Sequence, residues 1–350
     1  MKILITGNMG YVGPRLVEQL RLTKPGAVLV GLDTGYFAHC LTGVNIFPEN
    51  RLDEQYFGDV RKLSQDLFDG VDAVVHLAAI SNDPMGDRFE EVTFDINYQA
   101  SVDLAKAAKA AGVGHFVFAS SCSVYGFAEG GARNEQSDIN PLTAYAKSKI
   151  KMEEELNQLA DENFVVTCLR FATACGSSDR LRLDLVLNDF VAGAIASKRI
   201  TVLSDGTPWR PLIHVKDMAL AMDWALQREG AHGGFFLTLN AGSNGWNYQV
   251  RDLAQAVADV IPGVDVSINK DAPADKRSYQ VDFSLYEKLA PDHQPKMDLK
   301  SAIEDVAERL ETMAFNDEEF RSSQLIRLKV ISEHREQGRL NNRLQWIRDA

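Results

Sequence analysis

The chain has 350 residues, of which 45% are hydrophobic and 25% charged, and its net charge is −12 at pH 7. This composition is typical of a globular protein of one large or two medium domains, and the acidic balance argues against nucleic acid or anionic membranes as partners. No apolar run approaches the ~20 residues of a membrane span. The first strand is expected from residue 2, which leaves no room for a signal peptide, so we expect a soluble, cytoplasmic protein. Neither disulfide nor metal-ligand spacing is found among the cysteines, Cys40, Cys122, Cys168 and Cys175.

The opening sequence MKILITGNMGYVG has the features of a phosphate-binding turn. The apolar run over residues 3–5 has no polar alternation, which predicts a parallel strand covered on both faces. Gly7, Gly10 and Gly13 then permit a tight turn, a close approach of the main chain to a pyrophosphate, and close packing of the next helix. Pro14 is tolerated in a first helical turn. We therefore expect a helix from about residue 13 to 20 whose amino end faces phosphates.

An acidic residue ends the next predicted strand, which covers residues 27–32. Asp33 follows Gly13 by 20 residues, and a carboxylate at this point can accept both ribose hydroxyls of NAD. No arginine follows closely to bind a 2′-phosphate. The pattern therefore favours NAD over NADP, while the alternative interpretation of Asp33 as a solvated loop acid stays open.

The rest of the first half alternates between strands and helices. We expect a short strand closed by residues 58–60, strands over 71–79 and 115–119, helices over 61–68 and 97–111, and a loop at 83–86. This alternation predicts an α/β fold in which a doubly wound parallel sheet of the Rossmann type carries helices on both faces. Ligands of such sheets lie at the carboxyl ends of the strands.

The second half alternates less regularly and predicts a smaller, interleaved α/β substrate lobe. We divide the chain into an NAD-binding domain over 1–170, with its sheet completed by about 212–241, a substrate lobe over 171–211 and 242–315, and a helical tail over 316–350. In the tail, Phe320, Leu325, Leu328 and Ile331 fall on one side, which predicts packing or oligomerisation. The expected strands are 165–170, 200–203, 213–215, 235–240 and 264–268, and the helices are 145–160, 181–196, 217–227 and 247–260.

Two further motifs carry chemical groups. The segment SSCSVYG at 120–126 directly follows a buried strand, so its hydroxyls are expected at a strand carboxyl end. Tyr145 and Lys149 are four residues apart at the start of a helix and share one face of it. An ammonium beside a phenol lowers its pKa and makes it a better base. A Y-x-x-x-K pattern alone is usually a helical surface, but here it follows a glycine turn and a serine-rich strand end.

With these motifs in this order, the chain resembles the extended short-chain dehydrogenase/reductase family, and within it the NAD-dependent sugar-nucleotide epimerases and dehydratases of the UDP-galactose 4-epimerase type. The resemblance runs from residue 1 to about 290 and does not cover the tail beyond 315. It implies that Tyr145 is the catalytic base, that Lys149 also binds the nicotinamide ribose, and that Ser121 hydrogen-bonds the reacting oxygen of the sugar. The sequences that carry it are TGNMGYVG, Asp33, GDV at 58–60, HLAA at 76–79, SSCSVYG, YAKSK, LRFATACG and GTPWRPLIHVKD.

On this basis we predict two sets of binding residues in addition to the catalytic group of Ser121, Tyr145 and Lys149. The NAD site is predicted to comprise Gly7, Gly10, Tyr11, Val12, Gly13, Asp33, Asp59, Val60, Leu77, Ala78, Ala79, Tyr145 and Lys149. The substrate site is predicted to comprise Ser81, Asn82, Ser121, Ser123, Thr173, Arg182, Asn188, Arg210 and Arg277.

Departures from the family pattern bear on the reaction. Cys122 and Ser123 stand where the 4,6-dehydratases carry an Asp-Glu pair, so elimination of water would lack its acid and base. Another base would have to come from the loop 81–87, where Asp83 and Asp87 are the only acids. Thr173 replaces a substrate-binding Asn, and Ala272 replaces an Arg of the family. Diphosphate binding is therefore reassigned to Arg210, which aligns with a family diphosphate Arg. Arg180, Arg182 and Arg277 are further candidates, for which a role as ordinary surface residues is an equally good explanation. His76 and His214 are interpreted as core residues and not as metal ligands.

The sequence thus predicts an NAD-dependent epimerase of a nucleotide-activated sugar, acting at C4 through a transient 4-keto intermediate. The family resemblance also implies a homodimer, and the small and apolar side chains of helices 97–111 and 145–160 support this expectation. A 4-keto-sugar reductase with an exchangeable cofactor and a 4,6-dehydratase with displaced acids are the enzyme alternatives. A non-catalytic Rossmann redox sensor is the alternative from another class, against which the presence of Tyr145 and Lys149 argues.

Overall fold

A computed structural model describes residues 1–128, 130–272 and 278–347. Its centre is a seven-stranded sheet in the order β10-β6-β5-β4-β1-β2-β3, in which every neighbouring pair is parallel. The inner strands are apolar and buried on both faces, as the uninterrupted runs of Ile, Leu and Val predict. The strands are β1 (Lys2–Thr6), β2 (Val28–Asp33), β3 (Glu54–Phe57), β4 (Ala73–His76), β5 (His115–Ser121), β6 (Val165–Phe171) and β10 (Phe236–Ala241).

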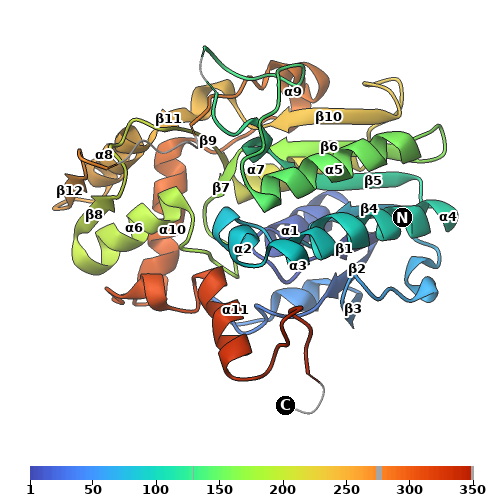
Figure 1. Cartoon of the computed structure of the whole chain (residues 1–350), viewed down its shortest axis with the longest axis horizontal. Coiled ribbons are helices and arrows are strands. Elements are labelled where there is room, and N and C mark those ends of the chain that lie inside the picture. Colours follow the sequence, from blue (N-terminus) through green and yellow to red (C-terminus); the bar gives the residue numbers. More distant parts are fainter. Residues whose placement is uncertain (129, 273–277, 348–350) are drawn as a thin grey trace.

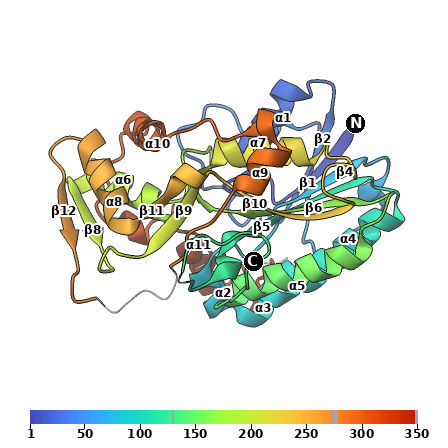
Figure 2. The ribbon, with the colours of Figure 1, turned by 90° about the horizontal axis from the view of Figure 1, so that it is seen from above.

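Helices cover both faces of this sheet, so the predicted doubly wound fold is confirmed (Figure 2). One face carries α1 (Gly13–Thr23), α7 (Val215–Ala225) and α9 (Ser284–Leu289). The other face carries α2 (Asp83–Arg88), α3 (Glu90–Phe94), the π-helical turn η3 (Asp95–Ala100), α4 (Ser101–Ala110) and α5 (Ala144–Leu159).

A second lobe lies beyond the carboxyl ends of the strands (Figure 1). It contains a three-stranded sheet of β7 (Thr173–Cys175), β9 (Trp209–His214) and β11 (Asn247–Gln249), and a two-stranded sheet of β8 (Arg199–Val202) and β12 (Asp265–Ile268). Its helices are α6 (Val186–Ser197), α8 (Val250–Val260) and α10 (Leu299–Thr312). Short 3₁₀ turns complete the described secondary structure: η1 (Pro48–Arg51), η2 (Gln65–Phe68), η4 (Cys122–Tyr125), η5 (Asn244–Trp246), η6 (Pro291–His293) and η7 (Phe320–Ser322).

The tail after α10 packs back onto the rest of the chain. Up to residue 347, where the described part of the tail ends, its single α-helix is α11 (Arg327–Glu336), so the tail is less helical than the sequence predicts (Figure 1). Phe320, Leu325 and Ile331 are buried as predicted, and Leu328 is half-buried. Further along, the Leu344 carbonyl accepts a hydrogen bond from the Tyr36 hydroxyl, which lies just after β2. Packing within the chain therefore accounts for the apolar side of the tail.

Three local predictions were wrong. Residues 61–68 form no α-helix, because Arg61 folds back onto Asp59 with three short contacts of 2.6–3.1 Å and holds a turn there. The expected loop at 83–86 is the first part of α2, which the Asn82 side chain caps by accepting the Met85 N–H at 2.9 Å. The helix expected from residue 181 begins only at Val186, after an extended stretch.

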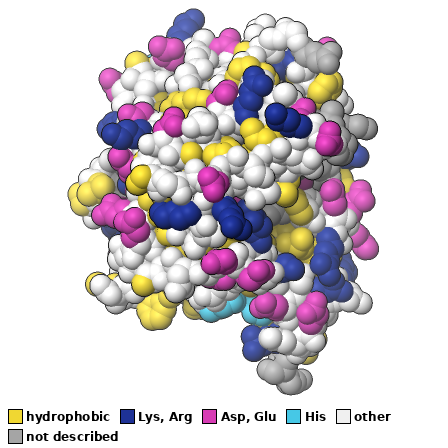
Figure 3. Space-filling model, turned by 90° about the vertical axis from the view of Figure 1, so that its left-hand side faces the viewer, with side chains coloured by type: hydrophobic (Ala, Val, Ile, Leu, Met, Phe, Trp, Pro, Cys, Tyr) yellow, Lys and Arg dark blue, Asp and Glu magenta, His cyan; other side chains and the backbone are white. Residues whose placement is uncertain are grey.

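Some surface properties follow directly from this arrangement. On the face formed by the second lobe, acidic and basic side chains are interspersed with apolar ones and no basic patch stands out (Figure 3). Across the described ranges, no helix combines the length and the apolar character that crossing a bilayer requires. All four cysteines are buried free thiols.

Candidate functional site

A cavity of about 760 Å³ lies where the carboxyl ends of the central strands meet the second lobe. Residues that directly follow or end β1, β2, β4, β5 and β6 line it, together with the loop before α6 and part of the tail. This is the position at which ligands of doubly wound sheets bind. The volume is in the range of cofactor pockets.

The glycine turn forms one wall of the cavity. Gly7 has φ +75°, and a Cβ on it would lie 2.6 Å from the Ala78 amide nitrogen, so no other residue fits there without displacing β4's continuation. At Gly13 a Cβ would lie 2.1 Å from the Asn8 carbonyl oxygen, which explains how α1 starts so close to the strand. Gly7, Gly10, Tyr11 and Val12 line the cavity, whereas Gly13 lies beneath it. The turn therefore leaves main-chain surface open to a ligand, as NAD requires.

Asp33 connects the glycine turn to the end of β2. One carboxylate oxygen accepts the Met9 N–H at 3.0 Å and the other accepts the Gly35 N–H at 2.8 Å. Burial raises the pKa of Asp33, and these hydrogen bonds oppose the rise. Asp33 lines the cavity together with Asp59 and Val60 at the end of β3. A ribose would meet a carboxylate whose orientation is already fixed.

We predict that Asp33→Ala weakens the binding of NAD at least about 10-fold and that of NADP much less, because only the unmodified ribose loses a charged acceptor. Titration calorimetry with both cofactors measures this ratio. Asp53→Ala is a control. The Asp53 carboxylate also accepts a main-chain N–H of β2, that of Leu29, but Asp53 does not line the cavity. An equal loss for NAD and NADP would show that Asp33 is not at the ribose.

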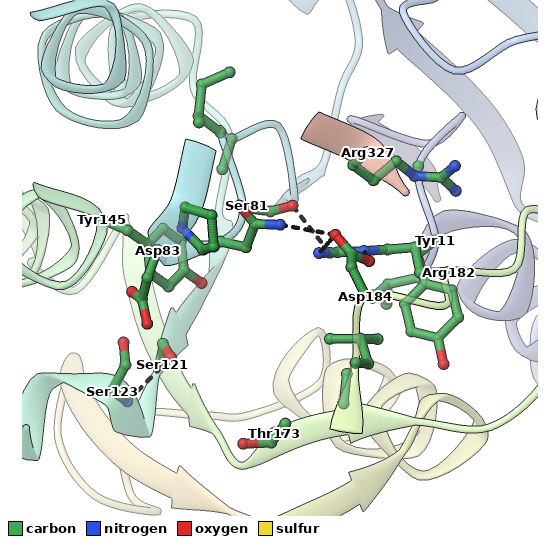
Figure 4. Close-up of a pocket in the computed structure, with 18 of the residues that line it drawn as sticks. Tyr11, Ser81, Asp83, Ser121, Ser123, Tyr145, Thr173, Arg182, Asp184 and Arg327 are labelled. Atoms are coloured by element: carbon green, nitrogen blue, oxygen red, sulfur yellow. Dashed lines mark hydrogen bonds and ion pairs between the residues drawn. The ribbon is translucent and has the colours of Figure 1, made fainter. Parts of the chain in front are cut away.

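Tyr145 and Lys149 lie at the opposite end of the same cavity, on the first turns of α5. The Lys149 ammonium is 5.5 Å from the centre of the Tyr145 ring and donates a 2.6 Å hydrogen bond to the Ala119 carbonyl. Ser121, at the end of β5, faces Tyr145 and also accepts the Ser123 N–H at 3.1 Å (Figure 4). The structure thus brings the three predicted catalytic residues together.

The electrostatics of this group differ from the sequence-based expectation. Burial raises the pKa of Tyr145 to about 12, although the Ser121 hydroxyl works in the opposite direction. Burial also lowers the pKa of Lys149 to about 7. The predicted lowering of the phenol pKa by the neighbouring ammonium was therefore wrong, because desolvation is the largest cause of the pKa shift of each group.

The predicted substrate residues fall into three groups. Ser81, Asn82, Ser121, Ser123, Thr173, Arg182 and Arg210 line the cavity. Asn188 does not line it, because its buried amide binds the Gly176 N–H, the Tyr11 hydroxyl and the Arg182 carbonyl. Arg277 lies outside the described residues.

Arg182 is held by an internal partner. Its guanidinium donates to both carboxylate oxygens of Asp184, at 2.9 and 3.1 Å, and to the Ser81 hydroxyl at 3.1 Å (Figure 4). Asn82 donates to the same carboxylate at 2.8 Å. This cluster bridges the middle of the cavity, so a diphosphate would have to displace Asp184 to bind Arg182. Asp184 was not predicted, because the segment before it was interpreted as helix.

Two further residues of the cavity wall, Asp83 and Arg327, were not among the predicted binding residues. Asp83, at the start of α2, lies beside Tyr145 (Figure 4) and accepts a 2.7 Å hydrogen bond from Thr143, which caps α5. Cys122, which replaces a dehydratase acid, is buried and donates to the Arg170 carbonyl, and burial raises its pKa. Arg327 enters the cavity from the tail, where no sequence motif marks it. The acids available near Tyr145 are therefore on α2 and not beside Ser121.

The two histidines are structural, as predicted. His76 contacts the Thr6 hydroxyl at 2.6 Å and the Ser101 hydroxyl at 2.7 Å, and burial lowers its pKa to about 3. His214 contacts Asp305 at 3.0 Å and accepts the Lys216 N–H. Among the residues that the structure describes, no cluster of three or more ligand-type side chains is suited to a metal ion.

Comparison with known proteins agrees with this geometry. The profile of the NAD dependent epimerase/dehydratase family matches residues 3–242, and the chain belongs to this family. NAD is accordingly its cofactor, and the open glycine turn and the fixed carboxylate of Asp33 fit that group.

Individual relatives are similar to the chain over most of their length. The protein named uncharacterized UDP-glucose epimerase YtcB of Bacillus subtilis is 31% identical over 229 residues, which cover 62% of this chain and 70% of the relative. UDP-glucose 4-epimerase of Lactobacillus helveticus is 28% identical, and the match covers 65% of this chain and 72% of that enzyme. In fold, the chain is similar to UDP-glucuronic acid 4-epimerase of Bacillus cereus, with a TM-score of 0.76, 21% identity and coverage of 89% and 100%. It is also similar in fold to the NDP-hexosamine 5,6-dehydratase TunA, with a TM-score of 0.76 and 22% identity; the match covers 90% of this chain and 99% of TunA.

Proposed function

We propose that the protein epimerises a nucleotide-activated sugar at C4, with NAD as a cofactor that is regenerated in each turnover. The observation that carries this proposal is the placement of Ser121, Tyr145 and Lys149 at one end of a cavity whose other end holds the glycine turn and Asp33. The names of the relatives support a UDP-sugar as the substrate class. When bound, NAD supplies the hydride acceptor and donor that the inversion of C4 needs.

The chain's own residues would handle the proton. Tyr145 takes the proton of the C4 hydroxyl and returns it after inversion, while Ser121 hydrogen-bonds the same oxygen and orients it. In the ligand-free protein the raised pKa of Tyr145 keeps the phenol protonated at neutral pH. A positive charge brought next to the phenol lowers this pKa, and Lys149 contributes such a charge when its amine is protonated. Lys149 is also placed to bind a ribose hydroxyl.

Part of the cavity wall comes from the second lobe. Ser81, Ser123 and Thr173 offer hydroxyls to the cavity that Tyr145 lines, and Arg210 on β9 adds a cation. Thr201 and Ser204 complete this part of the wall. We assign the sugar to Ser81, Ser123 and Thr173, and the nucleotide to the part of the wall that contains Arg210. This assignment goes with the proposed division of the chain into an NAD domain, a substrate lobe and a tail.

A dehydratase is the second candidate, because Asp83, one of the two acids that the sequence offered for elimination, has its carboxylate beside Tyr145. Elimination of water from a sugar needs an acid and a base in addition to the tyrosine. Asp83 would supply one of the two. Cys122 cannot supply the other, because it is buried and its thiol is engaged by the Arg170 carbonyl.

The two candidates differ in how they treat solvent protons, which gives the test. We expect that UDP-glucose and UDP-glucuronic acid, incubated with the protein in deuterated water without added cofactor, yield a C4 epimer with no deuterium on carbon, as NMR of the products can show. A 4-keto-6-deoxy product carrying deuterium would identify a dehydratase. Net oxidation of added NADH with a 4-keto sugar would identify a reductase, the third possibility.

Two further parts of the proposal concern the state of the protein. We infer a cytoplasmic location, which suits four buried free thiols. We also infer a homodimer, on the family resemblance alone. The apolar side chains of α4 and α5 face inward, and the outer positions, such as Asp103, Lys106, Lys147 and Lys151, are polar and exposed. The apolar side chains of these helices therefore give little support to a dimer formed through α4 and α5.

A further inference from the structure

Arg327, the first residue of α11, has an unusual environment for an arginine. Its side chain is 1% exposed, and its guanidinium lies 4.6 Å from the centre of the Phe37 ring. One terminal nitrogen, Nη2, donates a 2.7 Å hydrogen bond to the Arg180 carbonyl. The other, Nη1, is buried and has no hydrogen-bond partner. A buried N–H group of a cation without an acceptor is costly, so it marks a place where an acceptor belongs.

No carboxylate of the described residues forms an ion pair with Arg327. The charged groups around it are Arg180, Arg182 and Asp184, and Asp184 is already bound on both oxygens by Arg182. The Cys40 thiol lies within hydrogen-bonding reach of Arg327, but a thiol is a weak partner. Burial lowers the pKa of Arg327 to about 10, so the group stays cationic at neutral pH. A positive charge with no carboxylate partner among the described residues therefore lies in the wall of the cavity.

The contacts of Arg327 indicate which end of the cavity it belongs to. Phe37, on which it stacks, follows Asp33 by four residues. The loop that accepts its hydrogen bond also touches the glycine turn, since Ser178 donates to the Tyr11 carbonyl at 2.6 Å. Figure 4 shows Arg327 on the same side as Tyr11 and across the cavity from Tyr145. Arg327 thus contacts the segment after Asp33 and the loop that touches the glycine turn, at the end of the cavity where the adenosine ribose and the phosphates are expected.

The rest of the tail is fixed to the same region. The Trp346 indole N–H donates to the Thr34 carbonyl at 2.6 Å, Arg61 donates to the Arg343 carbonyl at 2.7 Å, and His334 contacts the Tyr36 carbonyl at 3.1 Å. Thr34 and Tyr36 line the cavity just after Asp33. The tail therefore holds α11 against the segment that carries the predicted ribose acceptor.

We propose that Arg327 is a cofactor-binding residue, contributed by the tail outside the matched family region, and that its free N–H groups bind the pyrophosphate of NAD. The pyrophosphate is the anionic part of this cofactor, and a guanidinium is the side chain best suited to it. The diphosphate of the substrate is expected at Arg210, toward the second lobe. The proposal rests on NAD binding and does not depend on which sugar is converted.

The test compares ligands with and without the pyrophosphate on the full chain freed of NAD. We expect Arg327→Met to weaken NAD and ADP at least about 10-fold in titration calorimetry, the effect of losing a charge-assisted hydrogen bond, and to leave adenosine within about 2-fold. Lys329→Met is the matched control, because Lys329 is an exposed cation on the same helix that does not line the cavity. It should change neither ligand.

Because a buried arginine can also support folding, Arg327→Lys is measured in parallel with near-ultraviolet circular dichroism. It keeps the charge, loses the planar fork, and is expected to bind ADP a few-fold more weakly with adenosine unchanged. An equal loss of ADP and adenosine in either variant would reduce Arg327 to a packing residue. Unchanged ADP affinity, or a larger loss for NADP than for NAD, would also overturn the assignment to the pyrophosphate.

Discussion

Tyr145→Phe is expected to lower turnover of the nucleotide sugar by at least ~10²-fold, because a positioned acid or base typically contributes that much. The phenol ring is half-buried on the first turn of α5, and phenylalanine fills the same space. Folding and NAD affinity should therefore change little. Steady-state kinetics on the C4 epimerisation, together with NAD titration, measure both effects.

Tyr98→Phe provides a matched control, because its hydroxyl binds Glu155 at 3.1 Å outside the cavity. Turnover in this variant should stay near that of the unmodified protein. If Tyr145→Phe retained near-normal turnover, the proton would have to be taken by another group, and Asp83 would be the first to examine. A loss of NAD binding equal to the loss of turnover would instead indicate a disturbed site.

The central fold was predictable because its signals are local. The apolar run of β1 and the glycines that follow specify a strand, a turn and a helix within a few residues of each other. The start of α2 was also encoded locally, by Asn82 as a cap and Pro84 in the first turn, but was interpreted as a loop. By contrast, the extended stretch before α6 is held by a hydrogen bond from the Leu183 N–H to the Leu325 carbonyl. These two residues are far apart in the sequence, so no local pattern predicts their contact.

The candidate site divides in the same way. Asp33, Ser121 and Tyr145 end strands or begin a helix, so their arrival at one edge of the sheet follows from topology. Arg327 is separated by 147 residues from the carbonyl that it binds, and no period or motif connects the two. The pKa directions of Tyr145 and Lys149 likewise depend on burial by distant parts of the chain, so the i, i+4 spacing predicted the contact but not its electrostatic result.

The second large effect is expected on stability, at a buried ion pair beneath the helix that carries Tyr145. Arg170 on β6 donates to both oxygens of Glu153 on α5, at 2.6 to 3.2 Å, and Ser120 donates to the same carboxylate at 2.5 Å. The two charged side chains are only 8% and 6% exposed. The pair thus connects α5 to β5 and β6 without help from solvent.

Glu153→Leu should lower the free energy of unfolding by about 3–5 kcal/mol, because it leaves the Arg170 charge buried with the Tyr125 hydroxyl but without its carboxylate partner. Arg170→Met should cost a similar amount, whereas the double variant Glu153→Leu/Arg170→Met should cost less than either single change, because no charge then remains buried. Urea unfolding of the NAD-free chain measures all three. Lys300→Met tests the contrast with an exposed ion pair, in which the partners Lys300 and Glu304 are 72% and 55% exposed, and should change stability by less than about 1 kcal/mol. Additive losses in the double variant would contradict the coupling and show that Glu153 and Arg170 act through separate neighbours.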